Sequence, residues 1–126
     1  MRRIHVAALA LGMLAGCRPL PEPPEALTRI LAEGEAAEAR GDGETACASY
    51  ARAAEAFPYH AEAWSYYGES LRFWRHDLPA ARAAFEKALR VPQATPRALA
   101  FSWRGLGEIL REGGDVEGAI RHFEKS

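Results

Sequence analysis

The sequence predicts an all-α fold, an α–α superhelix of about three helix-turn-helix repeats. Between residues 26 and 126, Ala, Glu, Arg and Leu dominate, and apolar residues recur every three or four positions. No stretch there alternates apolar and polar residues as a half-buried strand would. The segments WSYYGESL (64–71) and WRGLGEIL (103–110) share Trp, Gly and Leu at the same offsets. A structural unit is therefore repeated.

Clusters of glycine and proline divide this region into six predicted helices. The breaks fall at Gly41-Asp42-Gly43, Phe57-Pro58, His76 to Pro79, Pro92 to Pro96, and Gly113-Gly114-Asp115. Asp42, Asp77 and Asp115 are predicted to cap the second helix of each hairpin, because a carboxylate at that place accepts a free backbone N–H. Thr95 and Pro96 are predicted to be the N-cap and first residue of the fifth helix.

Aligned in three copies, the chain repeats a set of residues at fixed offsets. The copies read Ile30, Gly34, Ala37, Asp42, Ala46, Tyr50, Ala53 and Pro58; Trp64, Tyr67, Gly68, Leu71, Asp77, Ala81, Phe85, Ala88 and Pro92; and Trp103, Leu106, Gly107, Leu110, Asp115, Ala119 and Phe123. This pattern resembles the tetratricopeptide repeat, a helix-turn-helix unit of about 34 residues. The resemblance covers residues 27 to 126, as repeats at about 27–60, 61–95 and 96–126.

The repeated residues have a packing role in this interpretation. Gly34, Gly68 and Gly107 lack a Cβ, so the two helices of a hairpin can approach closely while an aromatic ring of the second helix fills the space beyond. A Trp and a Gly at helical spacing are also compatible with a ligand-binding motif. The repetition in the same phase favours core packing.

The first residues form a separate unit. Arg2 and Arg3 precede an apolar run from Ile4 to Ala15, as in a secretory signal peptide over residues 1–16. The run is shorter than the ~20 apolar residues of a membrane-spanning helix. Leu14-Ala15-Gly16-Cys17 resembles the lipobox of bacterial lipoproteins, which implies a lipid on Cys17. The alternatives are an ordinary signal peptide or a short anchor with a chance cysteine.

Residues 17–25 are predicted to be an extended tether between the lipid and the folded domain of residues 26–126. Four prolines fall within residues 19–24, and proline fixes φ and removes backbone donors. A ligand for a proline-binding domain is the alternative. Beside a lipid, a tether is the better interpretation.

Composition and motifs argue against catalysis, metal binding and nucleic-acid binding by this chain. Without residues 1–16 the charge would be 14 − 17 = −3, which does not favour nucleic acid as the partner. His60, His76 and His122 lie far apart in the sequence and do not have the spacing of metal ligands. The sequence also has no glycine-rich phosphate-binding loop. No cofactor or metal is therefore expected. Cys47 occupies a position in the helical repeat that is typical of a small packing residue rather than of a redox centre. We therefore expect a protein that is not an enzyme.

The resemblance implies a concave groove where a protein or peptide partner binds. The groove is lined by the residues that directly follow the repeated marker residues in the first helix of each hairpin, because these residues form a stripe on another side of the helix. Transferring these groove positions to this sequence gives the predicted peptide-groove residues, with Phe73 as an apolar anchor at the rim. They are Leu31, Glu35, Glu38, Ser65, Glu69, Arg72, Phe73, Arg104, Glu108 and Arg111. The alternative is that these charges pair between repeats, Glu69 with Arg104 or Glu38 with Arg72, on a solvated face. Tyr59, Tyr66, Phe73 and Trp74 are not marker residues, and either packing or an adhesive patch would account for them.

Together these features predict an envelope lipoprotein that acts as a protein-binding scaffold or adaptor, with an assembly or pilotin-like role. Arg18 after the cysteine implies the outer membrane, facing the periplasm, by resemblance to lipoproteins. Two alternatives stay open: a non-catalytic accessory subunit of a cell-wall enzyme, and a self-associating structural protein. The last repeat lacks a polar capping helix, so Ile120 is expected to be exposed unless a partner, a second copy or further sequence covers it.

Overall fold

The computed structural model describes residues 23–126, apart from the side chains of residues 116 and 117. The predicted signal peptide and Cys17 lie outside the described residues. Six helices were predicted, and six are found in the described part: α2 (Glu25–Ala39), α3 (Gly43–Ala56), α4 (Ala61–Phe73), α5 (Leu78–Arg90), α6 (Pro96–Glu112) and α7 (Val116–Lys125). Residues 23–126 contain no strand. The prediction of an all-α superhelix is confirmed.

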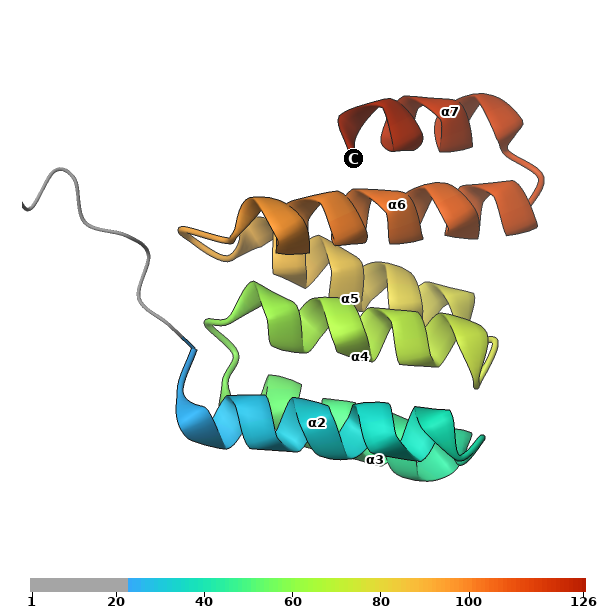
Figure 1. Cartoon of the computed structure of the whole chain (residues 1–126). Coiled ribbons are helices and arrows are strands. Elements are labelled where there is room, and N and C mark those ends of the chain that lie inside the picture. Colours follow the sequence, from blue (N-terminus) through green and yellow to red (C-terminus); the bar gives the residue numbers. More distant parts are fainter. Residues whose placement is uncertain (1–22) are drawn as a thin grey trace, which may run out of the picture.

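The helices form three antiparallel hairpins, α2–α3, α4–α5 and α6–α7, stacked in chain order (Figure 1). The first helices contact one another, because α4 lies against both α2 and α6. The helices α3 and α5 pack behind them, and each also contacts the first helix of the next hairpin. Within residues 23–126, no helix is both long enough and apolar enough to cross a membrane.

The three hairpin turns share one construction. Asp42, Asp77 and Asp115 each accept a backbone N–H three residues on, at 2.9–3.1 Å, so the predicted caps are confirmed. Thr95 likewise accepts the N–H of Ala98 at 3.2 Å. The residue before each aspartate has a positive φ: Gly41 and Gly114 adopt this conformation freely, whereas His76, with φ 52°, is strained there.

Each hairpin closes around a glycine and an aromatic ring, as predicted. Gly34 faces the ring of Tyr50, and a Cβ on that glycine would lie 2.6 Å from Cζ of the ring. Phe85 and Phe123 face Gly68 and Gly107 in the same way, with the nearest ring atoms at 3.0 Å and 2.9 Å from such a Cβ. These glycines are buried. The repeated WxxxG element therefore serves packing.

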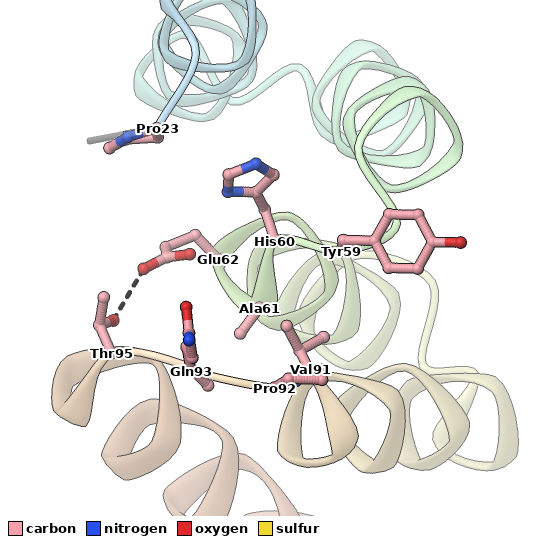
Figure 2. A pocket seen from close by; sticks show the side chains of 10 residues that line it. Pro23, Tyr59, His60, Ala61, Glu62, Val91, Pro92, Gln93 and Thr95 are labelled. Atoms are coloured by element: carbon pink, nitrogen blue, oxygen red, sulfur yellow. Dashed lines mark hydrogen bonds between the residues drawn. The ribbon is translucent and has the colours of Figure 1, made fainter. Parts of the chain in front are cut away.

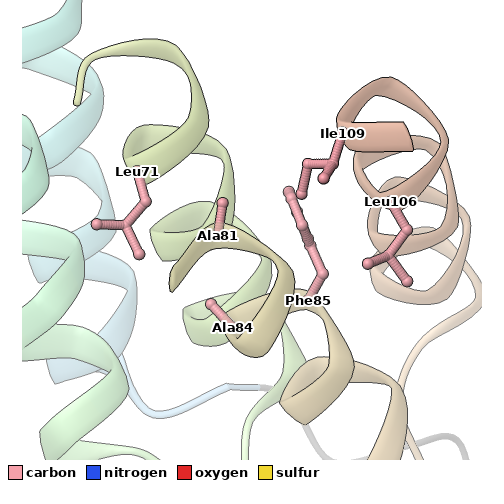
Figure 3. Close-up of a cluster of buried hydrophobic side chains, with 6 residues drawn as sticks. All are labelled: Leu71, Ala81, Ala84, Phe85, Leu106 and Ile109. Carbon is pink, nitrogen blue, oxygen red and sulfur yellow. The ribbon is translucent and has the colours of Figure 1, made fainter. Parts of the chain in front are cut away.

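The largest core cluster joins the second hairpin to the third (Figure 3). It consists of Leu71, Ala81, Ala84, Phe85, Leu106 and Ile109. The ring of Phe85 lies between α5 and α6, so it packs within its own hairpin and against the next one. Cys47 is also buried, at 2% exposure, and its thiol donates to the Ser70 carbonyl at 3.4 Å. Cys47 therefore packs inside the protein, as its position in the helical repeat predicted.

Candidate functional site

The candidate site is the surface formed by α2, α4 and α6, here called the concave groove. It contains two adjoining cavities. The Arg97 cavity, of about 430 Å³, is lined by Pro23, Thr28, Leu31, Glu35, Glu62, Ser65, Tyr66, Thr95, Arg97, Ala98 and Phe101. The Arg104 cavity, of about 410 Å³, is lined by Glu38, Tyr66, Glu69, Phe73, Trp74, Phe101 and Arg104.

Tyr66 on α4 and Phe101 on α6 line both cavities and form the ridge between them. Their rings stack with centroids 6.0 Å apart and an interplanar angle of 24°. Tyr66 also packs against the ring of Tyr50 on α3, with the two ring centroids 5.3 Å apart. The position of Tyr66 is therefore fixed by α3 as well. Partly exposed aromatic rings held by packing lose little entropy when a partner covers them.

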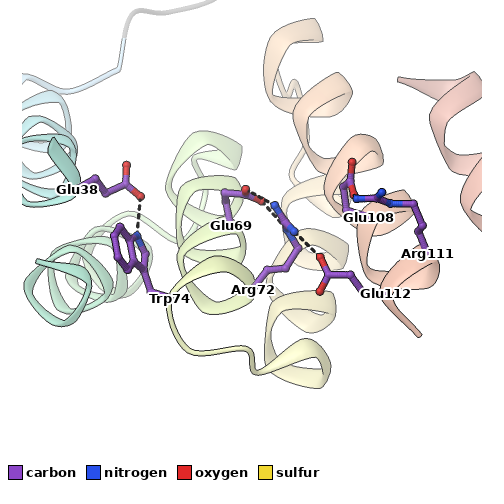
Figure 4. Close-up of polar contacts among 7 residues, drawn as sticks. All are labelled: Glu38, Glu69, Arg72, Trp74, Glu108, Arg111 and Glu112. Atoms are coloured by element: carbon purple, nitrogen blue, oxygen red, sulfur yellow. Dashed lines mark hydrogen bonds and ion pairs between the residues drawn. The ribbon is translucent and has the colours of Figure 1, made fainter. Parts of the chain in front are cut away.

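The carboxylates of α2 are held in place by neutral donors. The hydroxyl of Tyr66 donates to Glu35 at 3.0 Å, and that of Tyr50 donates to Glu38 at the same distance. The indole N–H of Trp74 also points to Glu38, at 3.4 Å (Figure 4). Burial, and then the neighbouring carboxylates, raise the pKa of both tyrosines. The phenols therefore stay protonated and remain hydrogen-bond donors to the two carboxylates.

Arg72 bridges the second and third hairpins. Its guanidinium pairs with Glu69 of its own helix at 2.6 Å and with Glu112 at the end of α6 (Figure 4). Only 16% of its side chain is exposed, and the hydrogen bond to Glu69 raises the pKa of Arg72 above its usual value, although burial acts in the opposite direction. The pairs Glu69–Arg104 and Glu38–Arg72, considered from the sequence, are not formed among the described residues. Arg72 instead takes both of its acidic partners from α4 and α6.

The other basic side chains in and beside the groove differ in whether they form ion pairs. Arg111 pairs with Glu108 one turn earlier, and its side chain is 62% exposed. Arg97 and Arg104 make no ion pair within the described residues. The guanidinium of Arg104 lies over the ring of Phe101, 4.8 Å from its centroid. The free positive charge of the groove therefore belongs to α6.

The sequence-predicted groove residues occupy different positions. Five of them line the two cavities and have exposed or half-buried side chains: Leu31, Glu35, Glu38, Glu69 and Arg104. Phe73 does so too, with 55% exposure. Ser65 reaches the Arg97 cavity but is only 3% exposed, with its hydroxyl bonded to the Glu62 carbonyl. Arg72, Glu108 and Arg111 form ion pairs and do not line either cavity.

The predicted groove residues did not include Tyr66, Phe101 or Arg97, although Tyr66 was noted as an aromatic residue outside the marker positions. The predicted stripe was placed about 100° from the Trp64 and Trp103 positions, whereas Tyr66, Phe101 and Arg97 lie about 120–200° from them at 100° per residue. On α4 and α6 the groove therefore extends further round the helix than the predicted stripe. The stacking of Tyr66 on Phe101 depends on how α4 and α6 cross, which no single helix encodes.

A smaller cavity, of about 100 Å³, lies outside the groove and next to Pro23 (Figure 2). It is bounded by Pro23, His60, Glu62 and the loop at residues 91–95, and Thr95 donates to Glu62 at 2.7 Å. Tyr59 is 82% exposed beside it. Within the described residues, no group of three or more His, Cys, Asp or Glu side chains could hold a metal ion.

The stacked hairpins and the groove on their first helices can be compared with known families. Residues 74–126 match the tetratricopeptide repeat. The matched range contains α5, α6 and α7, while α2, α3 and α4 lie before it and are linked to the tetratricopeptide pattern by their aligned residues. No curated protein matches the chain. The tetratricopeptide repeat is a scaffold for protein–protein interaction, and its stacked first helices form the extended concave surfaces that such scaffolds use.

Proposed function

We propose that this protein is an adaptor that holds a segment of a partner protein in the concave groove, and that a lipid on Cys17 anchors it to the outer membrane, facing the periplasm. The observation that carries the proposal is the continuity of the groove. Tyr66 and Phe101 belong to both cavities, so one peptide segment can contact α2, α4 and α6 together.

The groove has the features of a peptide-binding surface. Two aromatic rings stack at its centre, Phe73 is 55% exposed at its rim, and charged side chains surround them. Aromatic and arginine side chains supply most of the binding energy at protein interfaces, especially where neighbouring groups exclude water. The helices beneath are packed through glycine–ring contacts, so the surface needs little rearrangement on binding.

The membrane anchor rests on the sequence. An extended, proline-rich chain rises about 3.1 Å per residue, so the six residue steps from Cys17 to Pro23 would span about 19 Å. Pro23 lines the Arg97 cavity, and the tether therefore joins the domain beside the groove. In this proposal the partner is held close to the membrane, as an assembly or pilotin-like role requires.

The anchor is tested by metabolic labelling with a fatty acid that can be detected on gels. The wild-type chain should carry the label and sediment with outer-membrane fractions. Cys17→Ala should carry none and leave that fraction. A labelled Cys17→Ala chain, or an unlabelled wild type, would refute the lipid on Cys17.

The groove is tested by crosslinking in intact cells, with a photoreactive amino acid placed at Phe73 and, as the matched control, at Tyr59. Both positions are exposed aromatic residues, but only Phe73 lines the groove. A partner protein should be crosslinked from Phe73 and not from Tyr59. Crosslinks of equal yield from both positions would contradict the groove, and a product of two copies of this chain would favour self-association.

A further inference from the structure

We infer that the groove selects a partner segment with charge of both signs: apolar side chains on either side of the Tyr66–Phe101 ridge, a basic side facing α2 and an acidic side facing α6. This inference rests on the proposed function and specifies the chemistry of its partner. It follows from the position and bonding of the charged side chains on the two walls.

The apolar contacts come from the division of the groove. Tyr66 and Phe101 separate two cavities of about 430 and 410 Å³, so a segment that crosses them meets one apolar recess on each side. Leu31 and Ala98 line the first recess, and Phe73 and Trp74 line the second. Two large apolar side chains of one segment would then enclose the ridge and remove it from water.

The α2 wall is negative. Glu35 and Glu38 line the groove, and each is held by a tyrosine hydroxyl at 3.0 Å. A neutral donor fixes a carboxylate without cancelling its charge. Basic side chains of a partner therefore find carboxylates already oriented on this wall.

The α6 wall is positive within both cavities. Arg97 lines one and Arg104 the other, and neither is paired within the described residues. They are seven residues apart, which is about two helical turns or ~10.5 Å. Two acidic side chains about 10 Å apart on the partner would meet both guanidinium groups. A segment with a single sign of charge would be repelled by one wall, so the groove favours segments in which the two signs are separated.

The test is selection from a random library of 12-residue peptides on the full chain. Wild-type protein should enrich peptides with two large apolar residues, acidic residues and a basic residue. The double variant Arg97→Glu/Arg104→Glu should bind these peptides at least tenfold more weakly and should enrich peptides in which basic residues replace the acidic ones. Arg121→Glu, an exposed change on α7 outside the groove, should select as wild type does.

A second variant tests the other wall. Glu35→Lys should abolish the preference for the basic residue and leave the acidic preference intact. Circular dichroism confirms that each variant is folded. If the selected peptides need Tyr66 and Phe101 but bind the charge variants as tightly as wild type, the inference is overturned and the groove stands. If the peptides are indifferent to Tyr66→Ala and Phe101→Ala, or none is enriched, the proposed groove fails as well.

Discussion

Phe85 of α5 lies between two glycines, Gly68 of its own hairpin and Gly105 of the next. A Cβ on Gly68 would lie 3.0 Å from the ring, whereas a Cβ on Gly105 would overlap it, with Cε1 at 2.6 Å. One ring therefore fixes both the closure of the second hairpin and the spacing of α5 from α6. Since α4 contacts α6 as well, this spacing also sets the width of the groove.

Gly105→Ala should destabilise the fold, because the ring of Phe85 is fully buried and confined from both sides. Overpacking of this kind costs about 1–3 kcal/mol in the free energy of unfolding, measured by urea titration. Phe85→Leu in the same chain should make Gly105→Ala less costly. A double-mutant cycle without coupling between the two changes would contradict the contact.

Arg72→Ala should destabilise the protein more than Arg111→Ala. Arg72 is only 16% exposed and joins α4 to α6 through two carboxylates, whereas Arg111 is 62% exposed and pairs within one helix. We expect a loss of about 1–2 kcal/mol for Arg72→Ala and below about 0.5 kcal/mol for Arg111→Ala. Thermal melts measure both, and equal losses would show that the bridge contributes nothing between hairpins.

Alkaline pH should destabilise the fold. The pKa values of Tyr50 and Tyr66 are raised above 10, chiefly by burial, so the folded state holds these protons more tightly than the unfolded chain. Their contribution is complete below pH ~10 and is lost as the pH rises above it. Tyr50→Phe should therefore show a smaller drop in Tm between pH 9 and pH 11 than wild type. Tyr59→Phe is the matched control, and identical slopes for Tyr50→Phe and wild type would count against the prediction.

Arg104→Glu should weaken partner capture without lowering Tm. Its guanidinium is exposed above Phe101 and unpaired within the described residues, so the fold does not depend on its charge. Loss of one charged contact at an interface is expected to weaken binding about tenfold, or ~1.4 kcal/mol. Quantitative affinity capture compares it with Arg121→Glu. A fall in Tm as large as the loss of binding would assign Arg104 to folding instead.

The sequence predicted the helices and turns because their signals are local. Asp42, Asp77 and Asp115 cap helices through contacts three residues away, and glycine before Asp42 and Asp115 permits the turn. The glycine–ring contacts within each hairpin were predictable from their repetition. Gly105 was not recognised, because its ring partner is on another hairpin and it has no counterpart in the other two copies.

The two cavities lie on the helices that the sequence predicted for the groove, but their lining differs in detail. A register of one residue beyond the marker positions put Arg72 and Arg111 on its surface, but both are taken up by ion pairs whose partners depend on side-chain reach and helix crossing. Tyr66 and Phe101 come together from α4 and α6. Their stacking is a tertiary contact, and the periodicity of either helix alone does not specify it.

The partner is proposed to lie on α2, α4 and α6. The most direct measurement is the ¹H–¹⁵N spectrum of the tryptophan indoles of the full chain, titrated with the partner segment identified by crosslinking. The three indoles report different places: Trp74 lines the groove, Trp64 donates to the Pro58 carbonyl, and Trp103 lies against His122 of α7. We predict that the Trp74 signal shifts while those of Trp64 and Trp103 stay in place. A shift of Trp103 with Trp74 unchanged would contradict the account.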